Sequence, residues 1–234
     1  MISHLASRLG QAILPPSFPW VPRSVTLVID DGPSDVTSVL LSRLKQRGHR
    51  AVLFVLGANI AGKEDTLIDA LRNGFALGNH SFGHPYFSQI SVNEARHEIE
   101  RTDALIDDLH IRAAVRRPAK WFRFPYLDTG EEHFTVLQTL LRDLGYQRPR
   151  ATGRRLHDED RERIDWPTTL CTFDWELRPE NDFRDLLRQA EPGEVIEFHD
   201  KPETVERFSL PLVEELSNRS LRGVVPRPVR GVLR

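Results

Sequence analysis

The sequence predicts an α/β protein in which parallel strands alternate with helices. Short apolar runs recur along the chain, and amphipathic stretches with apolar residues at helical spacing separate them. Polar residues suited to catalysis follow several of the apolar runs directly. Strands that alternate with helices pair in parallel through right-handed crossovers, so we expect one parallel sheet, either open or closed into a barrel.

The first half of the chain begins this alternation. Apolar residues from Val36 to Leu44 share one helical face, which predicts a helix over 36–47. Ser91 and Glu94 form a capping box that opens a longer helix, expected to end near residue 109. The other elements of this half are expected as strands over 25–29 and 51–56, a helix over 66–72, and an apolar run at 75–77 that leads into a loop at 78–85.

The second half continues the alternation. We expect strands over 121–124, 168–173 and 195–198, helices over 131–144, 182–190 and 204–217, and a polar loop over 148–165. No internal repeat and no low-complexity linker interrupts the pattern. We therefore expect a single domain over residues 1–234, with a motif-bearing core from about residue 24 to 216 and short extensions at both ends.

The composition gives the protein no broad electrostatic field. The 234 residues include 32 basic and 34 acidic side chains, for a formal net charge of -2. This balance provides no general attraction to nucleic acid or to an anionic membrane, and we expect neither as a partner. The single Cys171 excludes an intrachain disulfide framework and a zinc site built from several thiolates.

The apolar stretches are too short for a membrane span or a secretory signal. His4 and Arg8 interrupt the apolar residues near the N-terminus, and Pro15 and Pro16 follow closely. We therefore expect a cytoplasmic protein without an integral membrane span. No sequence pattern predicts an oligomeric state.

Two carboxylates and two histidines stand where predicted strands end. Asp30 and Asp31 follow the first apolar run, and His80 and His84 lie in a segment that contains two glycines and a proline. Neutral imidazole and carboxylate are ligands that zinc accepts, and a catalytic site leaves one position for water. This pattern predicts a divalent metal held by Asp31, His80 and His84, with Asp30 free as a base. For either motif alone, a plain turn or surface histidines would be an equal alternative, but their joint occurrence favours the metal site.

Further polar residues follow later strands. The carboxyl ends of parallel strands in a barrel converge on one face, where such folds hold their catalytic groups. We therefore expect a single metal-hydrolase site built from these strand ends. Its candidate residues are Asp30, Asp31, His80, His84, the segment 123–126, Asp174, Trp175, His199 and Asp200.

On these residues the chain resembles the polysaccharide deacetylases of the NodB-homology group, carbohydrate esterase family 4. The order and spacing of all five family motifs are reproduced between about residue 24 and residue 216. The resemblance implies a distorted (β/α) barrel of about seven parallel strands, fewer than the eight of the closed form. It also implies removal of an N-acetyl or related N-acyl group from an amino sugar of a poly- or oligosaccharide or glycoconjugate.

The resemblance assigns catalytic roles to matching residues. Asp30 matches the general base, Arg123 the arginine that orients this base, and His199 the general acid. Asp174 and Trp175 match a pair that tunes and packs the acid. The roles make chemical sense, because a departing amine needs a proton and an imidazole can supply one near neutral pH. The alternative for Arg123 and Asp174 is a purely structural ion pair.

The resemblance also assigns the ligands. Asp31, His80 and His84 match the metal triad, with zinc expected and cobalt, nickel or manganese as alternatives. The Arg-Phe-Pro-Tyr motif adds Pro125 and Tyr126 to the substrate site, where the backbone N–H of Tyr126 would help to stabilise the oxyanion.

Three positions depart from the family pattern. Ile29 stands where the family usually has Phe, and Cys171 stands where the fourth motif usually begins with an acidic residue. Glu197 replaces the apolar residue that cradles the acetyl methyl group. Period two along a strand puts Glu197 on the same face as His199, so we expect its carboxylate to accept a hydrogen bond from the substrate or to pair with a nearby arginine. We hypothesise an altered acyl pocket, suited to a formyl group or a more polar amide.

Two other functions fit parts of the pattern. One is an amidase that acts on a small acylated amine other than a sugar, with the same machinery. The other is a carbohydrate-binding protein that keeps the metal but has lost turnover, against which the intact base and acid argue. Among aromatic residues near the motifs, such as Tyr86 and Trp121, we expect core packing for most and sugar stacking for few.

Overall fold

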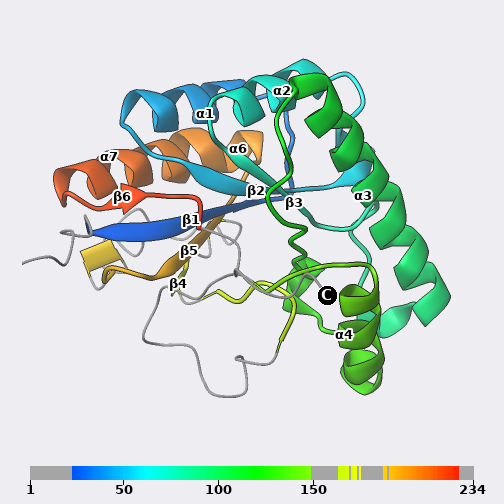
Figure 1. The fold of residues 1–234 in the computed structure, drawn as a ribbon. Coiled ribbons are helices and arrows are strands. Elements are labelled where there is room, and N and C mark those ends of the chain that lie inside the picture. The colour runs from blue at the N-terminus through cyan, green and yellow to red at the C-terminus, as the bar shows by residue number, and fades with distance from the viewer. Residues whose placement is uncertain are drawn as a thin grey trace, which may run out of the picture.

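The computed structural model describes residues 23–148, 163–168, 170–172, 174, 187–188 and 190–226 of the chain. Their strands form one sheet in the order β3-β2-β1-β5-β4, with β6 paired to β1 (Figure 1). Every pairing in this sheet is parallel. The strands are β1 (Ser24–Asp30), β2 (Ala51–Val55), β3 (Ala76–Asn79), β4 (Leu170–Cys171), β5 (Val195–His199) and β6 (Arg222–Gly223). The predicted parallel α/β sheet is thus confirmed, and its described strands do not close into a ring.

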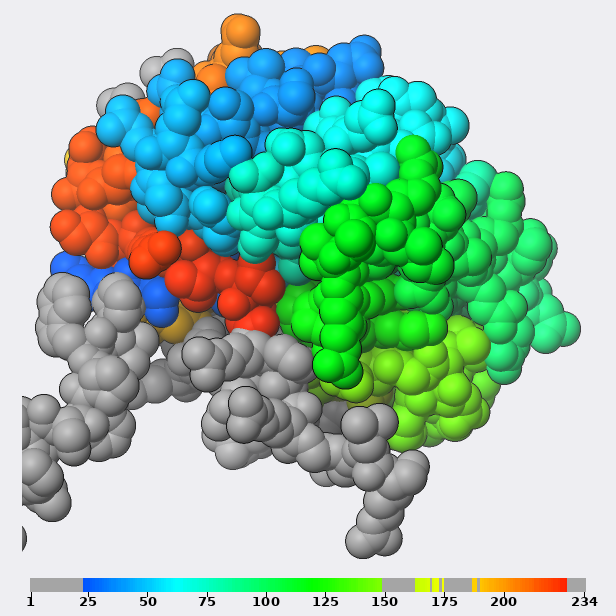
Figure 2. All heavy atoms as spheres, turned by 45° about the horizontal axis from the view of Figure 1, so that its top comes forward, coloured from blue at the N-terminus to red at the C-terminus, as the bar shows by residue number. Residues whose placement is uncertain are grey.

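Helices cover the sheet along one side. Helix α7 contacts α1, α1 contacts α2, and α2 contacts α3. In Figure 2 the atoms of these helices form a continuous layer over the strands. The α-helices of the described residues are α1 (Thr37–Gln46), α2 (Glu64–Arg72), α3 (Val92–Ala113), α4 (Phe134–Asp143), α6 (Pro202–Thr204) and α7 (Leu210–Asn218). Helix α4 contacts α3. Among the described residues, no helix is both long and apolar enough to cross a membrane.

Both faces of β1 are buried, and apolar side chains from each face precede its last residue. Leu27 and Ile29 pack into the core cluster beneath the helices, while Val28 packs on the opposite face with Trp166. Burial on both faces is expected for a central parallel strand. Because successive side chains alternate, Asp30 projects to the same face as Val28 and not towards the helices. The alternation therefore places the Asp30 carboxylate at the end of the strand, on the face of the sheet opposite the helices, which we call the inner face.

Strand β5 repeats this arrangement beside β1. Ile196 and Phe198 belong to the cluster beneath the helices, which leaves Glu197 and His199 on the inner face. The register places His199 directly opposite Asp30. Two neighbouring strands thus deliver three ionisable side chains to one place.

Several elements differ from the predictions. The capping box at Ser91 is present, but α3 continues to Ala113. The segment predicted as a strand over 121–124 makes only an isolated parallel bridge, from Phe122 to Asn79, and the residue before it, Lys120, makes another with Tyr146. The loop predicted over 78–85 begins two residues later, because 78–79 pair with β2 as the end of β3.

The last helix, expected over 204–217, is helical from Pro202 to Asn218, but its hydrogen-bonding pattern changes within it. A π-helical stretch at Val205–Ser209 separates α6 from α7, and Pro211 lies in the first turn of α7. Proline has no N–H for the preceding turn, so the interruption just before it has a local cause. Strand β6 is too short to leave an apolar pattern and was not predicted. The helix expected over 182–190 lies largely outside the described residues.

Candidate functional site

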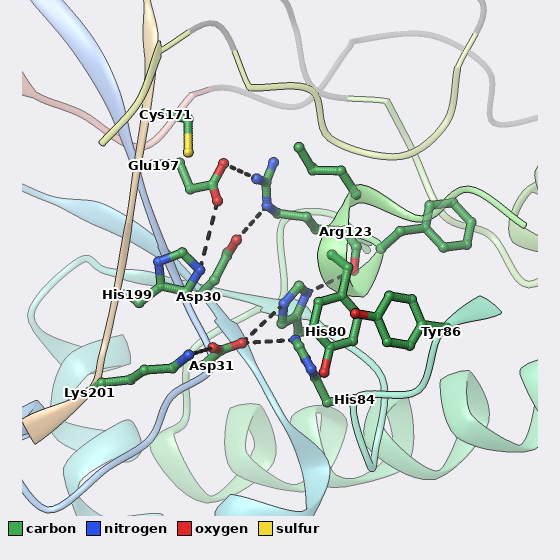
Figure 3. Close-up of a pocket in the computed structure, with 13 residues that line it drawn as sticks. Asp30, Asp31, His80, His84, Tyr86, Arg123, Cys171, Glu197, His199 and Lys201 are labelled. Atoms are coloured by element: carbon green, nitrogen blue, oxygen red, sulfur yellow. Dashed lines mark hydrogen bonds and ion pairs between the residues drawn. The ribbon is translucent and has the colours of Figure 1, made fainter. Parts of the chain in front are cut away.

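A pocket of about 520 Å³ lies at the carboxyl ends of β1 and β5. Its lining brings together Asp30, Asp31, His80, His84, Arg123 and His199, all of which the sequence placed at strand ends (Figure 3). Tyr126 and Glu197 also line it, whereas Pro125 is buried and lies outside the lining. Trp175 falls outside the described residues. The convergence of distant segments expected from a parallel sheet is therefore present.

The backbone around the pocket adopts an uncommon conformation. Asp31, His84 and Tyr126 have φ of 69°, 61° and 56°, in the left-handed region that side chains other than glycine seldom occupy. Each such residue costs on the order of 1–3 kcal/mol and persists only where its surroundings hold it. At Asp31 the Asn59 side-chain amide donates to the backbone carbonyl at 2.9 Å. The fold thus holds these side chains in fixed directions at a local cost.

The turn after Asp31 is anchored by Asp200. The hydroxyls of Thr37 and Ser34 donate to its carboxylate at 2.5 and 2.7 Å. A Cβ on Gly32 would meet the same carboxylate at 2.6 Å, so the approach needs glycine at this position. Burial raises the pKa of Asp200 above its ordinary value, although the two hydroxyls oppose this. Asp200, the residue after His199, thereby fixes the turn that follows Asp31.

Asp31, His80 and His84 form a cluster suited to a cation. Asp31 Oδ1 lies 3.4 Å from His80 Nε2 and 3.0 Å from His84 Nε2. The backbone carbonyl of Arg123 lies 2.9 Å from His80 Nδ1, and since a carbonyl only accepts, this nitrogen carries the proton. The Nε2 lone pair of His80 is then directed at the cluster, in the arrangement usual for metal-bound histidines. The donor set fits a divalent metal such as zinc.

The charge of Asp31 is secured by its neighbours. Burial alone would raise the pKa of Asp31, but the two imidazoles hold it far below its usual range. Lys201 Nζ approaches the other carboxylate oxygen at 2.8 Å. Burial would lower the pKa of Lys201, yet the contact with Asp31 raises it. Sequence patterns did not indicate this lysine, whose only signal was its place in the loop after His199.

Arg123 joins two carboxylates. Its Nε donates to Asp30 Oδ2 at 2.6 Å, as the resemblance implied, and a terminal nitrogen pairs with Glu197 Oε2. The arginine is 1% exposed. Burial would lower its pKa, but the two carboxylates raise it above the ordinary value. Asp30 Oδ1 is buried and accepts no hydrogen bond within the described part of the chain. That oxygen retains the capacity to take a proton.

Glu197 enters the pocket and meets an arginine, one of the two contacts expected of it. Its Oε2 also accepts from the Thr168 hydroxyl at 2.6 Å. Its Oε1 lies 3.8 Å from His199 Nε2. Figure 3 shows this carboxylate between Arg123 and His199, above Asp30. The two oxygens of Glu197 therefore have different surroundings.

His199 is held by both oxygens of Asp174. Asp174 Oδ1 lies 2.7 Å from His199 Nδ1, and Oδ2 accepts from the backbone N–H of His199 at 2.9 Å. This orientation turns Nε2 towards the pocket. Burial would lower the pKa of His199, but the bond and charge of Asp174, aided by Asp30 and Asp31, raise it. The imidazole is thus set to remain protonated at higher pH than a free histidine.

Aromatic side chains form the rim near the cluster of Asp31, His80 and His84. Tyr86 and Tyr126 stack with ring centroids 3.9 Å apart and planes 7° apart. Tyr126 also meets the ring of His84 edge-on at 4.4 Å. Both tyrosines are exposed, whereas Trp121 is buried in the core as expected. Core packing therefore does not account for Tyr86, and no spacing rule distinguished it from its buried neighbours.

Comparison with known proteins shows the family to which the chain belongs. The profile of the Polysaccharide deacetylase family matches residues 21–148. A peptidoglycan-N-acetylmuramic acid deacetylase, PdaC of Bacillus subtilis, is 39% identical over 97 residues, which are 40% of this chain and 21% of the relative. A peptidoglycan-N-acetylglucosamine deacetylase of Bacillus cereus is 31% identical over 132 residues, 52% of this chain and 46% of the relative. The chain thus spans less than half the length of these two relatives.

Solved structures show the same fold. A family 4 carbohydrate esterase from Streptomyces lividans, in complex with acetate, superposes with a TM-score of 0.68 at 24% identity, covering 88% of this chain and 96% of that one. The structure of PdaC from Bacillus subtilis gives a TM-score of 0.64 at 24% identity and covers 87% of this chain and 88% of that one. With the family profile matched over more than half of its length, the chain belongs to the polysaccharide deacetylase family.

Proposed function

We propose that the protein is a metal-dependent hydrolase that removes an N-acetyl or related N-acyl group from an amino sugar of a poly- or oligosaccharide or glycoconjugate. The observation that carries this proposal is the convergence of a His-His-Asp cluster, a carboxylate base and a buried histidine in one pocket. Relatives named as peptidoglycan and chitin deacetylases support the polysaccharide substrate.

Asp31, His80 and His84 would hold the metal. Zinc suits a set of two imidazoles and one carboxylate best, and cobalt, nickel or manganese are alternatives. When bound there, the ion would act as a Lewis acid towards the acyl carbonyl and the attacking water. We further expect the backbone N–H of Tyr126, at the pocket rim, to donate to the carbonyl oxygen.

Asp30 acts as the general base in this proposal. Its free Oδ1 takes a proton from the attacking water, while Arg123 holds Oδ2 and keeps the carboxylate aimed. Water adds to the carbonyl carbon, the carbon–nitrogen bond breaks, and the products are a carboxylic acid and a free amine. The amine leaves only if its nitrogen receives a proton.

His199 supplies that proton from Nε2. Asp174 fixes the ring through Nδ1, so the reactive nitrogen faces the pocket. The raised pKa of His199 keeps the acid charged until the step that needs it. Base and acid stand on neighbouring strands, opposite one another in register.

The test is metal content and acyl release on the same samples. We expect about one zinc ion per chain in the wild type, with acetate released from a chito-oligosaccharide, and loss of both in His80→Ala. Acetate release that persists in metal-free protein would contradict the proposal. Small acetylated amines assayed in parallel test the alternative amidase function, which would be favoured if they are turned over faster than the oligosaccharide.

The pH profile tests the role of His199. In Asp174→Asn the burial of His199 remains while its main charged partner is lost, so the pKa of His199 falls. The alkaline limb of kcat/KM then moves to lower pH, and we expect about a 10²-fold loss at pH 8 with a smaller loss below neutral pH. Asp143→Asn, at an exposed position, is the control and should leave the profile unchanged. A uniform loss at all pH values would show that Asp174 does not act through His199.

A further inference from the structure

The position of Glu197 bears on which acyl group the pocket accepts. Glu197 is 4% exposed, and its β5 position lies opposite Val28, two residues before the pair formed by Asp30 and His199. It therefore sits deeper along the inner face than the base and the acid. Cys171 of β4 is its neighbour in register and also lines the pocket. These residues form the floor of the pocket beneath the reacting groups.

The acyl substituent is the part of the substrate that reaches this floor. One oxygen of Glu197 lies within 4.8 Å of ligand atoms of both Asp30 and His199, so it borders the space between base and acid. The carbonyl carbon must occupy that space for both groups to act. The leaving nitrogen carries the sugar, which must extend towards the mouth because the rest of the saccharide lies outside the pocket. The small group on the far side of the carbonyl is left to face Glu197.

The carboxylate is fixed on one side and available on the other. Arg123 and Thr168 both donate to Oε2, which holds the group in place. No hydrogen bond reaches Oε1 from the described residues, and its ion-pair neighbour His199 Nε2 lies 3.8 Å away. Because Oε1 is held in place and can still accept a hydrogen bond, it favours a substrate group that donates one. Hydrogen bonds to a charged acceptor are stronger than those between neutral groups.

We infer that Glu197 makes the pocket selective for N-acyl groups that carry a hydrogen-bond donor next to the carbonyl, such as N-glycolyl, over N-acetyl. The inference rests on the proposed function and names the substrate class within it. The methyl group of an N-acetyl substrate would displace water from Oε1 and could not replace the hydrogen bond that the water donates. A hydroxymethyl group donates its O–H to Oε1 instead. The reaction is the same hydrolysis, in which water adds, the carbon–nitrogen bond breaks, and glycolate and the free amine are released.

The expected discrimination follows from the chemistry of the site. Sites that hydrogen-bond a substrate hydroxyl reject the analogue without it far more strongly than apolar pockets reject an added hydroxyl. We expect the wild type to hydrolyse an N-glycolyl chitotriose at least about tenfold faster, in kcat/KM, than the N-acetyl form. In Glu197→Leu the ratio should fall at least about tenfold, because the floor is then apolar.

Two control variants and a binding measurement accompany this comparison, all with the zinc-loaded chain. Glu197→Gln keeps the size of the side chain and an oxygen for Arg123 but loses the charge, so it should keep part of the preference. Glu206→Leu makes the same change at an exposed position and should leave the ratio at the wild-type value. Calorimetric binding of both trisaccharides to each protein provides a readout that does not depend on turnover.

The outcomes separate the inference from the function on which it rests. A wild-type ratio at or below one, or a ratio that Glu197→Leu leaves unchanged, would overturn the inference even if acetate is released. If neither trisaccharide is hydrolysed but the N-glycolyl form binds more tightly and loses this advantage in Glu197→Leu, the selectivity stands and the proposed activity fails. Equal binding together with no hydrolysis would overturn both.

Discussion

Asp30→Asn is expected to lower kcat for acyl release by about 10³-fold, within the range that a general base contributes. Asparagine fills the same space and still offers an oxygen to Arg123, but it cannot take a proton from water. The metal cluster uses Asp31 and both histidines, so zinc content should stay at the wild-type level. Measuring kcat and bound zinc on the same preparation separates loss of the base from loss of the metal.

Asp35→Asn is the matched control for this change. The Asp35 carboxylate is 89% exposed and pairs only with Lys63, at 3.3 Å, among the described residues. Its replacement should leave kcat unchanged. A kcat for Asp30→Asn close to that of the wild type would rule out Asp30 as the base and leave its pairing with Arg123 as a structural contact.

Arg123→Met is expected to have the largest effect on stability. The change leaves the carboxylates of Asp30 and Glu197 buried at 2% and 4% exposure without their shared cation. Removing one partner of a buried charge pair typically costs about 3–5 kcal/mol of unfolding free energy. Denaturant unfolding of the metal-free proteins would measure this loss without a contribution from bound zinc.

The controls for Arg123→Met separate the loss of a buried charge from the loss of a charge at the surface. Arg43→Met removes an arginine that pairs with Glu214 at 2.7 Å on the surface, and we expect a loss below about 0.5 kcal/mol. The double change Arg123→Met with Glu197→Leu removes one of the two orphaned carboxylates and should recover part of the stability. If Arg123→Met were as stable as Arg43→Met, the buried ion pairs would not contribute to the fold.

Local sequence patterns predicted those strands and helix starts whose determining residues lie close together in the chain. The apolar run ending at Asp30 predicted a buried strand, because its composition and length suit no other element in a parallel sheet. The capping box of Ser91 and Glu94 predicted the start of α3 for a similar reason, since its donors and acceptors lie within one turn. The end of α3 was placed too early because the left-handed Ala114 that terminates it has no such signal.

Side-chain partners from distant segments could not be predicted in the same way. Arg123 meets Asp30 across 93 residues of chain, and only the resemblance implied that contact. Its second contact, with Glu197, was one of two options that the strand period left open. Lys201 and Tyr86 had only their place near a motif to mark them, because the exposure and the neighbours of each depend on how loops from different strands meet.

The sequence by itself determined which residues stand at the ends of strands and on which face of each strand they project, because both follow from the period and length of local apolar runs. Only the tertiary structure decided how those ends are connected: one arginine shared by two carboxylates, a lysine on Asp31, and a carboxylate on the floor of the pocket. These contacts depend on distances between segments that no local pattern encodes. Among them, the contacts of Glu197 are those from which the selectivity of the site is inferred.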